Sequence, residues 1–298
     1  MGHPNSKDKI QRKSTQNIFR YAGGRRFHNV ESSNYFLPND DEEVDRLQLQ
    51  HFLFRDIWDG NFSSPINDFI DQGGANILDV GCGPGTWLLE MSTEYPRSSF
   101  TGIDMSPIFP VEIKPCNLNF QVANVLEKLP FPDNSFDFVY MRFLLTAFTE
   151  KEWIKAIQEL IRVVKPGGWL ELMEGDLAFN PEGPIGRILM NAFRSTLLAK
   201  SINPKICLQL QKWLSSSPQL HNFSFKEKSG PIGSWAGSIG ELACQDFCGT
   251  LHALRPILTA QLNKNPVEYD EMVAEFGKEC NENKTNFSHF RFFCQKLD

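Results

Sequence analysis

Residues 75–85 read ANILDVGCGPG, and this stretch decides the fold. It begins as a short apolar run, residues 77–80, which is typical of a buried strand. The run breaks into glycines at alternate positions, Gly81, Gly83 and Gly85, and an amphipathic segment follows over residues 86–94. A buried strand that ends in a glycine-rich turn and opens into a helix is the nucleotide-binding unit of doubly wound α/β folds. Glycine allows this turn because no Cβ blocks the approach of a ligand to the backbone.

The spacing of the glycines narrows the class of ligand. A dinucleotide fingerprint, G-x-G-x-x-G, requires glycine at position 86, where this chain has Thr86. Asp79 stands two residues before the first glycine, and a carboxylate there would repel a pyrophosphate. The pattern therefore favours a ligand that carries positive charge, such as an amino group or a sulfonium. The alternative is an ordinary tight turn after a strand.

Composition limits the classes of function. The 298 residues carry a net charge of −6, which argues against a nucleic-acid partner by bulk electrostatics. The seven cysteines are scattered, and Cys244 and Cys248 lack the second pair that a zinc site needs, so we expect no metal and a reducing compartment. No apolar run is long enough to span a membrane, so we expect no membrane partner. These features favour the cytoplasm, with the nucleus as an alternative because residues 7–13 are basic.

The N-terminal quarter divides into two predicted parts. Residues 1–28 carry seven Lys or Arg against one acid, and we expect a disordered basic tail. Residues 29–74 are expected to form an N-terminal helical cap. Its helix, over residues 39–58, would begin at Asn39 or Asp40 and close over the ligand pocket. Its apolar stripe comprises Val44, Leu47, His51, Phe54 and Trp58.

Two polar side chains on this helix have alternative interpretations. Arg46 and His51 can offer hydrogen-bond donors to a ligand. Alternatively, Arg46 is an exposed charge and His51 is a hydrogen-bonded core residue.

Strands and helices alternate along the rest of the chain. We expect strands at 77–80, 100–103, 120–123, 136–141 and 169–174, with helices after the glycine turn and after Thr149. Residues 75–175 then form a cofactor-binding α/β core. Residues 176–298 supply a helical substrate lid and the last two strands, 223–228 and 290–296. The lid helices are expected near 186–200, 205–215, 240–260 and 267–280. The fold class is α/β: a doubly wound, mostly parallel seven-stranded sheet with helical insertions.

An acidic residue follows the second predicted strand. Asp104 lies at about the distance from the glycine turn that separates a nucleotide loop from the acid that binds a ribose diol. A carboxylate can accept hydrogen bonds from two vicinal hydroxyls, and the neighbouring Met105 can lie against a flat base. The alternative is that Asp104 only caps the next turn.

Four motifs in order resemble the class I S-adenosylmethionine-dependent methyltransferases, whose fold is Rossmann-like. They are ILDVGCGPG, GIDMS, LPFPDNSFDFVY and VVKPGGWLELME, and they cover residues 76–175. The stretches YFLPND and DRLQLQH, upstream, and GPIGSW, downstream, are similar to a fungal subfamily that includes regulators of secondary metabolism.

The resemblance implies roles for individual residues. The turn formed by Gly81, Cys82, Gly83 and Gly85 would hold the methionine and ribose parts of S-adenosylmethionine, and Asp79 would face its amino group. Asp104 would bind the ribose and Met105 the adenine. Asn124 would accept from the adenine amino group, the Val125 amide would meet a ring nitrogen, and Met141 would lie under the methionine part. Many relatives carry Asp at the position of Asn124, but an amide oxygen can also accept.

The reaction implied is methyl transfer to a small metabolite or natural product, with oxygen or nitrogen as the acceptor atom. Glu174, Asp176, His221 and His252 are candidate bases, but each has a structural alternative, so we assign no catalytic base. A regulatory partner protein that binds the cofactor without robust turnover is one alternative function. A nicotinamide oxidoreductase is another, and Thr86 argues against it.

Overall fold

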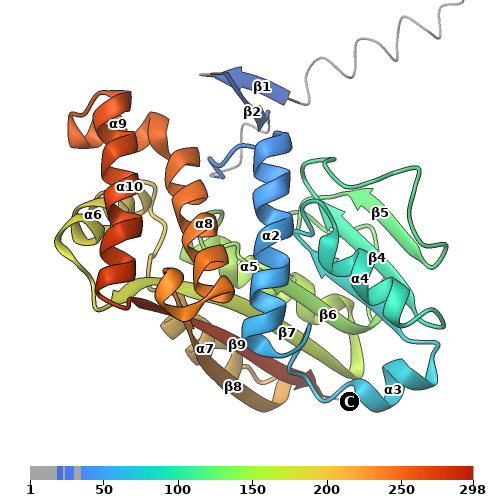
Figure 1. Ribbon diagram of the computed structural model, residues 1–298. Coiled ribbons are helices and arrows are strands. Elements are labelled where there is room, and N and C mark those ends of the chain that lie inside the picture. Colours follow the sequence, from blue (N-terminus) through green and yellow to red (C-terminus); the bar gives the residue numbers. More distant parts are fainter. Residues whose placement is uncertain (1–18, 23, 30–34, 298) are drawn as a thin grey trace, which may run out of the picture.

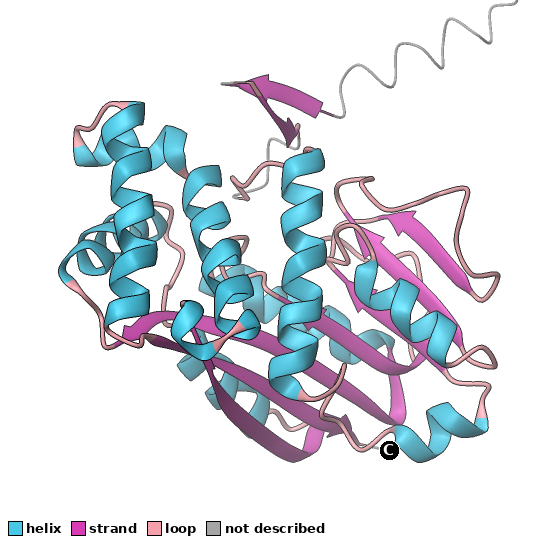
Figure 2. Cartoon of the chain, viewed as in Figure 1, coloured by secondary structure: helices cyan, strands magenta, loops and turns pink. Residues whose placement is uncertain are grey.

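A seven-stranded sheet forms the centre of the computed structural model, which describes residues 19–22, 24–29 and 35–297. Its strands lie in the order β5-β4-β3-β6-β7-β9-β8, with helices on both sides (Figure 2). The strand bounds are β3 Asn76–Val80, β4 Ser99–Asp104, β5 Leu118–Val122, β6 Phe136–Arg142, β7 Val164–Asn180, β8 Leu220–Pro231 and β9 Asn286–Lys296. The predicted α/β fold with a mostly parallel seven-stranded sheet is confirmed.

The pairing of the strands places a crevice at the middle of the sheet. β3 pairs in parallel with β4 on one side and with β6 on the other, whereas β9 is antiparallel to both β7 and β8. Successive strands add in one direction from β3 to β5 and in the other from β6 onward. Ligands of open α/β sheets bind where the order reverses, outside the carboxyl ends of the strands. In this chain that point lies above β3 and β6.

The helices pack on both sides of the sheet (Figure 2). Their bounds are α2 Asp41–Trp58, α3 Asn67–Gln72, α4 Thr86–Glu94, α5 Glu150–Val163, α6 Pro184–Ala199, α7 Ile206–Ser216, α8 Ser238–Ala253, α9 Arg255–Leu262 and α10 Pro266–Glu282, with a short 3-10 turn η2 at Ser234–Ala236. α5 begins after Thr149, as predicted, with a capping box: the Thr149 side chain accepts from the amide of Glu152, and the Glu152 side chain accepts from the amide of Thr149.

Helix α2 stands between α8 and α4 (Figure 1) and packs against both. The Asp40 side chain caps its start by accepting from the amide of Glu43. Near its end, Phe54 and Trp58 pack edge-on against His289 of β9, at ring-centroid distances of 5.0 and 5.2 Å. The helix predicted over residues 39–58 is confirmed, and two members of its apolar stripe, Phe54 and Trp58, belong to the main hydrophobic core.

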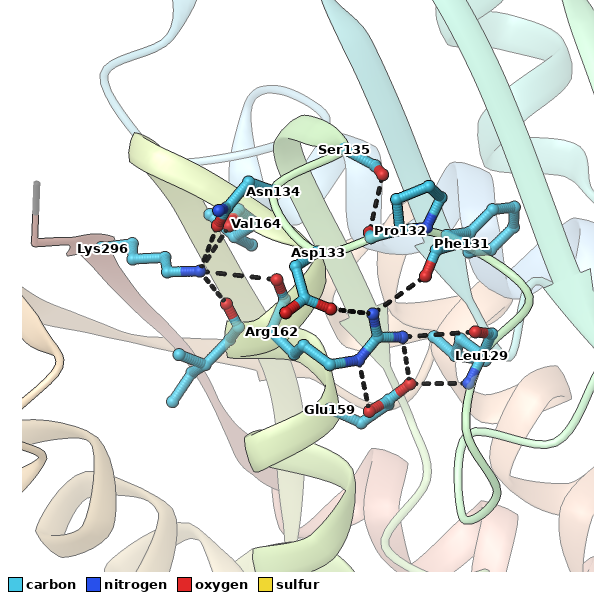
Figure 3. A network of polar contacts seen from close by, with 11 residues as sticks. Leu129, Phe131, Pro132, Asp133, Asn134, Ser135, Glu159, Arg162, Val164 and Lys296 are labelled. Carbon is cyan, nitrogen blue, oxygen red and sulfur yellow. Dashed lines mark hydrogen bonds and ion pairs between the residues drawn. The ribbon is translucent and has the colours of Figure 1, made fainter.

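A polar network fixes the loop that leads into β6 (Figure 3). Arg162 of α5 pairs with Asp133 at 2.7 Å and with Glu159 at 2.5 Å, and it donates to the carbonyl of Phe131. Lys296, at the end of β9, donates to the last carbonyls of α5, including that of Ile161 at 2.7 Å. These contacts lie at the amino end of β6, so they position the strand rather than the crevice.

Three predictions of local structure were wrong. Of the tail predicted to be disordered, the described part forms a hairpin, β1 (Phe19–Ala22) with β2 (Arg25–His28), and the remainder lies outside the described residues. The helix expected over 240–260 is two helices, because Pro256 has no backbone N–H to donate a hydrogen bond within a continuous helix. β7 begins at Val164, directly after α5, rather than at residue 169 as expected, and its register against β6 shifts between Phe136 and Phe138.

Candidate functional site

A cavity opens above the carboxyl ends of β3, β4 and β6, at the reversal point of the sheet. All the described residues that line it lie between positions 28 and 148: His28, Tyr35, Pro38, Asn39, Leu47, Gln50, Val80, Gly81, Cys82, Gly83, Pro84, Thr86, Ile103, Asp104, Met105, Ser106, Ile108, Ala123, Asn124, Val125, Arg142, Phe143, Leu144, Ala147 and Phe148. The region from 176 onward contributes none of them, so its role as a substrate lid stays a prediction.

The glycine turn forms one wall of the cavity. Gly81, Gly83 and Gly85 all have positive φ angles, 72°, 54° and 78°, which a residue with a Cβ rarely adopts. At Gly85 a Cβ would also lie 2.5 Å from the ring of Phe120, so a side chain does not fit. The tight turn predicted from the spacing of the glycines is therefore present. Cys82 lines the cavity within the turn, and burial raises the pKa of its thiol, which stays protonated.

Asp104 lies at the end of β4 and is held by backbone amides. One carboxylate oxygen accepts from the amide of Gly83 at 2.9 Å, and the other accepts from the amide of Ser106 at 2.7 Å. Burial raises the pKa of this carboxyl, and the two amides oppose that shift. Each carboxylate oxygen can accept a further hydrogen bond, so both remain available to hydroxyl groups of a ligand.

Two polar atoms beside the glycine turn are buried without a hydrogen-bond partner in the described structure: Asp79 Oδ1 and Thr86 Oγ1. The Asp79 side chain is 2% exposed, and burial raises its pKa to about 7. A buried polar group without a partner is costly, and such groups gather at sites that complete their hydrogen bonds with a ligand. Thr86 lines the cavity, whereas Asp79 is not among the lining residues and directly precedes one of them, Val80. Both atoms are candidates for hydrogen bonds with a bound molecule.

The remaining predicted residues fall into two groups. Met105, Asn124 and Val125 line the cavity. The Asn124 side-chain oxygen accepts from the amide of Leu126 at 3.0 Å, which fixes the orientation of the side-chain amide and leaves one lone pair on that oxygen. Met141 is buried in β6 and is not among the lining residues.

Arg142, which ends β6 and lines the cavity, is a site residue that was not predicted from the sequence. The signal in the sequence was that the mainly apolar strand expected over residues 136–141 is followed by a charged residue, Arg142, at its carboxyl end. The loop after it is tightly held: Phe143 has a positive φ of 57°, and its amide donates to the carbonyl of Met173 at 3.0 Å. A bulky residue with positive φ is strained, and such residues are frequent at functional sites.

Glu174 clamps the same loop from β7. Its carboxylate accepts from the amides of Leu144 at 2.6 Å and Leu145 at 3.2 Å, and burial raises its pKa to about 8. Glu174 is therefore occupied in holding the cavity wall. The other candidate bases, Asp176, His221 and His252, are also not among the described residues that line the cavity.

Helix α2 contributes Leu47 and Gln50 to the cavity, so the predicted cap does border the pocket. Arg46 points away from it, pairing with Glu43 at 2.5 Å and with Asp246 of α8 at 2.7 Å. His51 is buried and lies between Glu90 of α4 and Arg142. The hypothesis that Arg46 reaches the ligand is thus not supported by its geometry, and His51 touches the cavity only through Arg142.

The described part of the chain contains no group of three His, Cys, Asp or Glu side chains that could hold a metal ion. Within the same residues, none of the helices is both long and apolar enough to cross a membrane.

Known proteins resemble this chain in sequence. Residues 77–168 match a family model described as a methyltransferase domain. Methyltransferase pytC of Aspergillus terreus is 31% identical over 231 residues, which cover 73% of this chain and 67% of pytC. N-methyltransferase verN of Clonostachys rogersoniana is 31% identical over 57% of this chain and 60% of its own length. Secondary metabolism regulator laeA of Aspergillus fumigatus is 29% identical over 58% of this chain and 46% of its own length.

A solved structure shares the fold. Phosphoethanolamine N-methyltransferase 2 of Haemonchus contortus, crystallised with S-adenosyl-L-methionine, superposes with a TM-score of 0.50 at 14% identity. The match covers 98% of this chain and 74% of that one. At this identity the likeness concerns the fold alone.

Proposed function

The chain belongs to the class I S-adenosylmethionine-dependent methyltransferases of fungal secondary metabolism, and from this premise we propose that its cavity binds S-adenosylmethionine next to a small natural product. One observation carries the proposal: the orphaned Asp79 oxygen beside the glycine turn. Nothing in the described protein completes its hydrogen bonds. The ammonium group of an amino acid would do so and would also compensate a buried negative charge.

The other lining residues suit the remaining parts of this cofactor. Asp104 has free lone pairs for the two ribose hydroxyls, and the glycine turn leaves room for backbone contact with the ligand. Met105 and Val125 offer apolar surface to the adenine, and the Asn124 oxygen has one lone pair for its amino group. Thr86 Oγ1 can donate or accept once a ligand is present. Met141 lies behind this surface and would support it from the core.

When bound, the cofactor supplies a methyl group attached to a positively charged sulfur. The protein's contribution is to align the acceptor with that methyl group and to exclude water, and alignment alone can accelerate a reaction by several powers of ten. The strained, clamped loop after β6 gives the cavity a fixed wall, with Phe143, Leu144 and Phe148 facing it.

The lining favours an acceptor that is largely apolar. Its apolar lining includes Leu47 of α2 and, from the loop after β6, Phe143, Leu144, Ala147 and Phe148. We propose nitrogen or oxygen as the acceptor atom, with support for nitrogen from the names of two relatives, the N-methyltransferases verN and sirN. A regulatory partner role has weaker support, because the regulator laeA is 29% identical and matched over 46% of its own length, whereas the methyltransferases pytC and verN are 31% identical and matched over 67% and 60% of theirs.

The test is to incubate the full chain with S-adenosylmethionine labelled on its methyl group and a metabolite extract of the organism that produces the protein. We expect one or a few labelled small molecules by mass spectrometry, and much less of each with the Asp104→Ala variant when the cofactor concentration is limiting. If the protein binds the cofactor but labels no small molecule in any extract, the regulatory function replaces methyl transfer. If it binds no cofactor, the assignment of the cavity is wrong.

A further inference from the structure

Arg142 presents a cation to the cavity without a carboxylate partner. Among the residues that the structure describes, no acidic side chain lies within ion-pair distance of its guanidinium, and its side-chain hydrogen bond goes to Nδ1 of His51 at 3.2 Å. A guanidinium carries five N–H donors. A cation that is partly buried and has unused donors is suited to an anionic ligand, above all a carboxylate or phosphate.

The imidazole of His51 is neutral and accepts a hydrogen bond from Arg142, which positions the arginine side chain. Arg142 always donates, so Nδ1 must accept, and the proton resides on Nε2, which lies 2.6 Å from Glu90 Oε2. Burial, together with Arg142 and Arg55, holds the pKa of His51 at about 3, so the ring stays neutral. A neutral imidazole, unlike a carboxylate, does not neutralise the guanidinium, so the positive charge of Arg142 stays available to a ligand.

Glu90 in turn is fixed by α2. Its second oxygen pairs with Nε of Arg55 at 2.5 Å. The contacts Arg55–Glu90–His51–Arg142 therefore run from the surface of α2 to α4, return to His51 of α2, and end at Arg142 of β6. Such a chain restrains the rotamer of Arg142, in the way that outer partners orient a functional side chain.

The position of Arg142 relative to Asp79 suggests which anion it binds. The charge of Arg142 opposes the rise in the pKa of Asp79, so the two groups are close enough to interact. Asp79 has an unpaired oxygen and Arg142 has unpaired donors. Asp79 and Arg142 lie near the carboxyl ends of the adjacent parallel strands β3 and β6. A carboxylate acceptor and a guanidinium donor placed in this way complement the ammonium and the carboxylate of an amino acid.

We propose that Arg142 binds the carboxylate of the cofactor's methionine part and that His51 is a positioning residue that holds Arg142 in place. This inference rests on the proposed function. It extends that function by dividing recognition of the amino-acid head group between two opposite charges, Asp79 and Arg142. The alternative role of Arg142 is structural, as a contact that ties α2 to β6.

Three ligands separate these roles by calorimetry. S-adenosylhomocysteine has both charged groups, its decarboxylated analogue keeps only the amine, and 5′-methylthioadenosine has neither. We expect the wild-type protein to prefer S-adenosylhomocysteine to the decarboxylated analogue by about ten- to a hundredfold, the usual effect of a charged hydrogen bond. Arg142→Met should abolish this preference and should leave the affinity for 5′-methylthioadenosine unchanged.

Variants of His51 test its positioning role. His51→Asn keeps an oxygen acceptor near the position of Nδ1, whereas His51→Leu removes it. We expect the preference for the carboxylate to survive in His51→Asn and to fall in His51→Leu. Thermal unfolding of each variant shows whether it remains folded, and the ratio of two affinities does not depend on the fraction of folded protein.

The outcomes distinguish this inference from the proposed function. If the wild-type protein binds none of the three ligands, the proposed function fails. If it binds them and Arg142→Met keeps the full preference for S-adenosylhomocysteine, the cofactor's carboxylate lies elsewhere and this inference alone is overturned. A uniform loss for all three ligands in Arg142→Met would assign Arg142 to the structure of the cavity and would also overturn it.

Discussion

Binding of S-adenosylhomocysteine should weaken as the pH falls below neutrality, because Asp79 must lose a proton before it can accept the ligand's ammonium group. Burial raises the pKa of this carboxyl to about 7, with Asp104 adding to the rise and Arg142 opposing it. In the free protein the group is therefore largely protonated at about pH 6. The bound ammonium favours the ionised form, so binding releases a proton.

The size of the effect follows from the pKa. Below that value, each unit of pH costs about a factor of ten in affinity, or about 1.4 kcal/mol, because each unit lowers the ionised fraction tenfold. Between about pH 7.5 and about pH 5.5 the affinity should fall roughly twentyfold to thirtyfold. A carboxyl with its ordinary pKa near 4 would remain ionised throughout this range, and the affinity would not change.

Titration calorimetry at several pH values, in two buffers with different ionisation enthalpies, measures both the affinity and the number of protons released. Asp79→Asn is the matched control, since it keeps the shape of the side chain and cannot ionise. The control is needed because the pKa of Glu174 is about 8 and that of Asp104 is also raised. A wild-type affinity that does not change with pH, or an equal pH dependence in Asp79→Asn, would refute the reasoning.

Three further predictions concern single residues. Asp104→Ala should weaken binding of S-adenosylmethionine by about ten- to a hundredfold, and wild-type affinity of the folded variant by calorimetry would remove Asp104 from the site. Asn124→Asp should retain binding, because an oxygen acceptor remains, whereas Asn124→Leu should lose it; equal affinities of the three proteins would contradict this. Glu174 has a folded-state pKa of about 8, above its usual value, so its contribution to stability is present at low pH and is lost as the pH rises through 8. Thermal unfolding of the ligand-free protein should therefore show a decline in stability between about pH 5 and about pH 8 that is smaller in Glu174→Gln, and an identical decline in both proteins would count against it.

The sheet and the glycine turn could be predicted because their signals are local. Apolar runs at strand spacing, and the glycines of residues 81–85, depend on neighbours in the sequence. The two-sided burial of β3, with Ile77 and Leu78 fully buried, leaves little choice of register. Asp104 was found for the same reason, since the spacing from the turn to the end of the next strand is set by one helix.

Contacts between distant parts of the chain could not be predicted. Arg46 pairs with Asp246, 200 positions away, and periodicity does not show which way a helical arginine points. The hairpin at 19–28 depends on Arg25, which pairs with Asp40 at 2.6 Å. Arg142 was not predicted as a site residue because its role depends on a contact with His51, which lies 91 positions earlier in the chain on another element.

These distant contacts decide how α2 functions. We expected a helix that closes over the pocket, and α2 does border it through Leu47 and Gln50. Yet the pair between Arg46 and Asp246 is buried, with side-chain exposures of 10% and 3%. If the pair separates, Arg46 keeps its partner Glu43 on the same helix, but the buried carboxylate of Asp246 loses its cation; breaking a buried ion pair costs about 3–5 kcal/mol. A hinged motion of α2 would break this pair and would also withdraw Phe54 from the core, so α2 is a fixed wall of the cavity. A fixed wall can hold Arg142 in one orientation before the cofactor arrives, which lowers the entropy cost of binding.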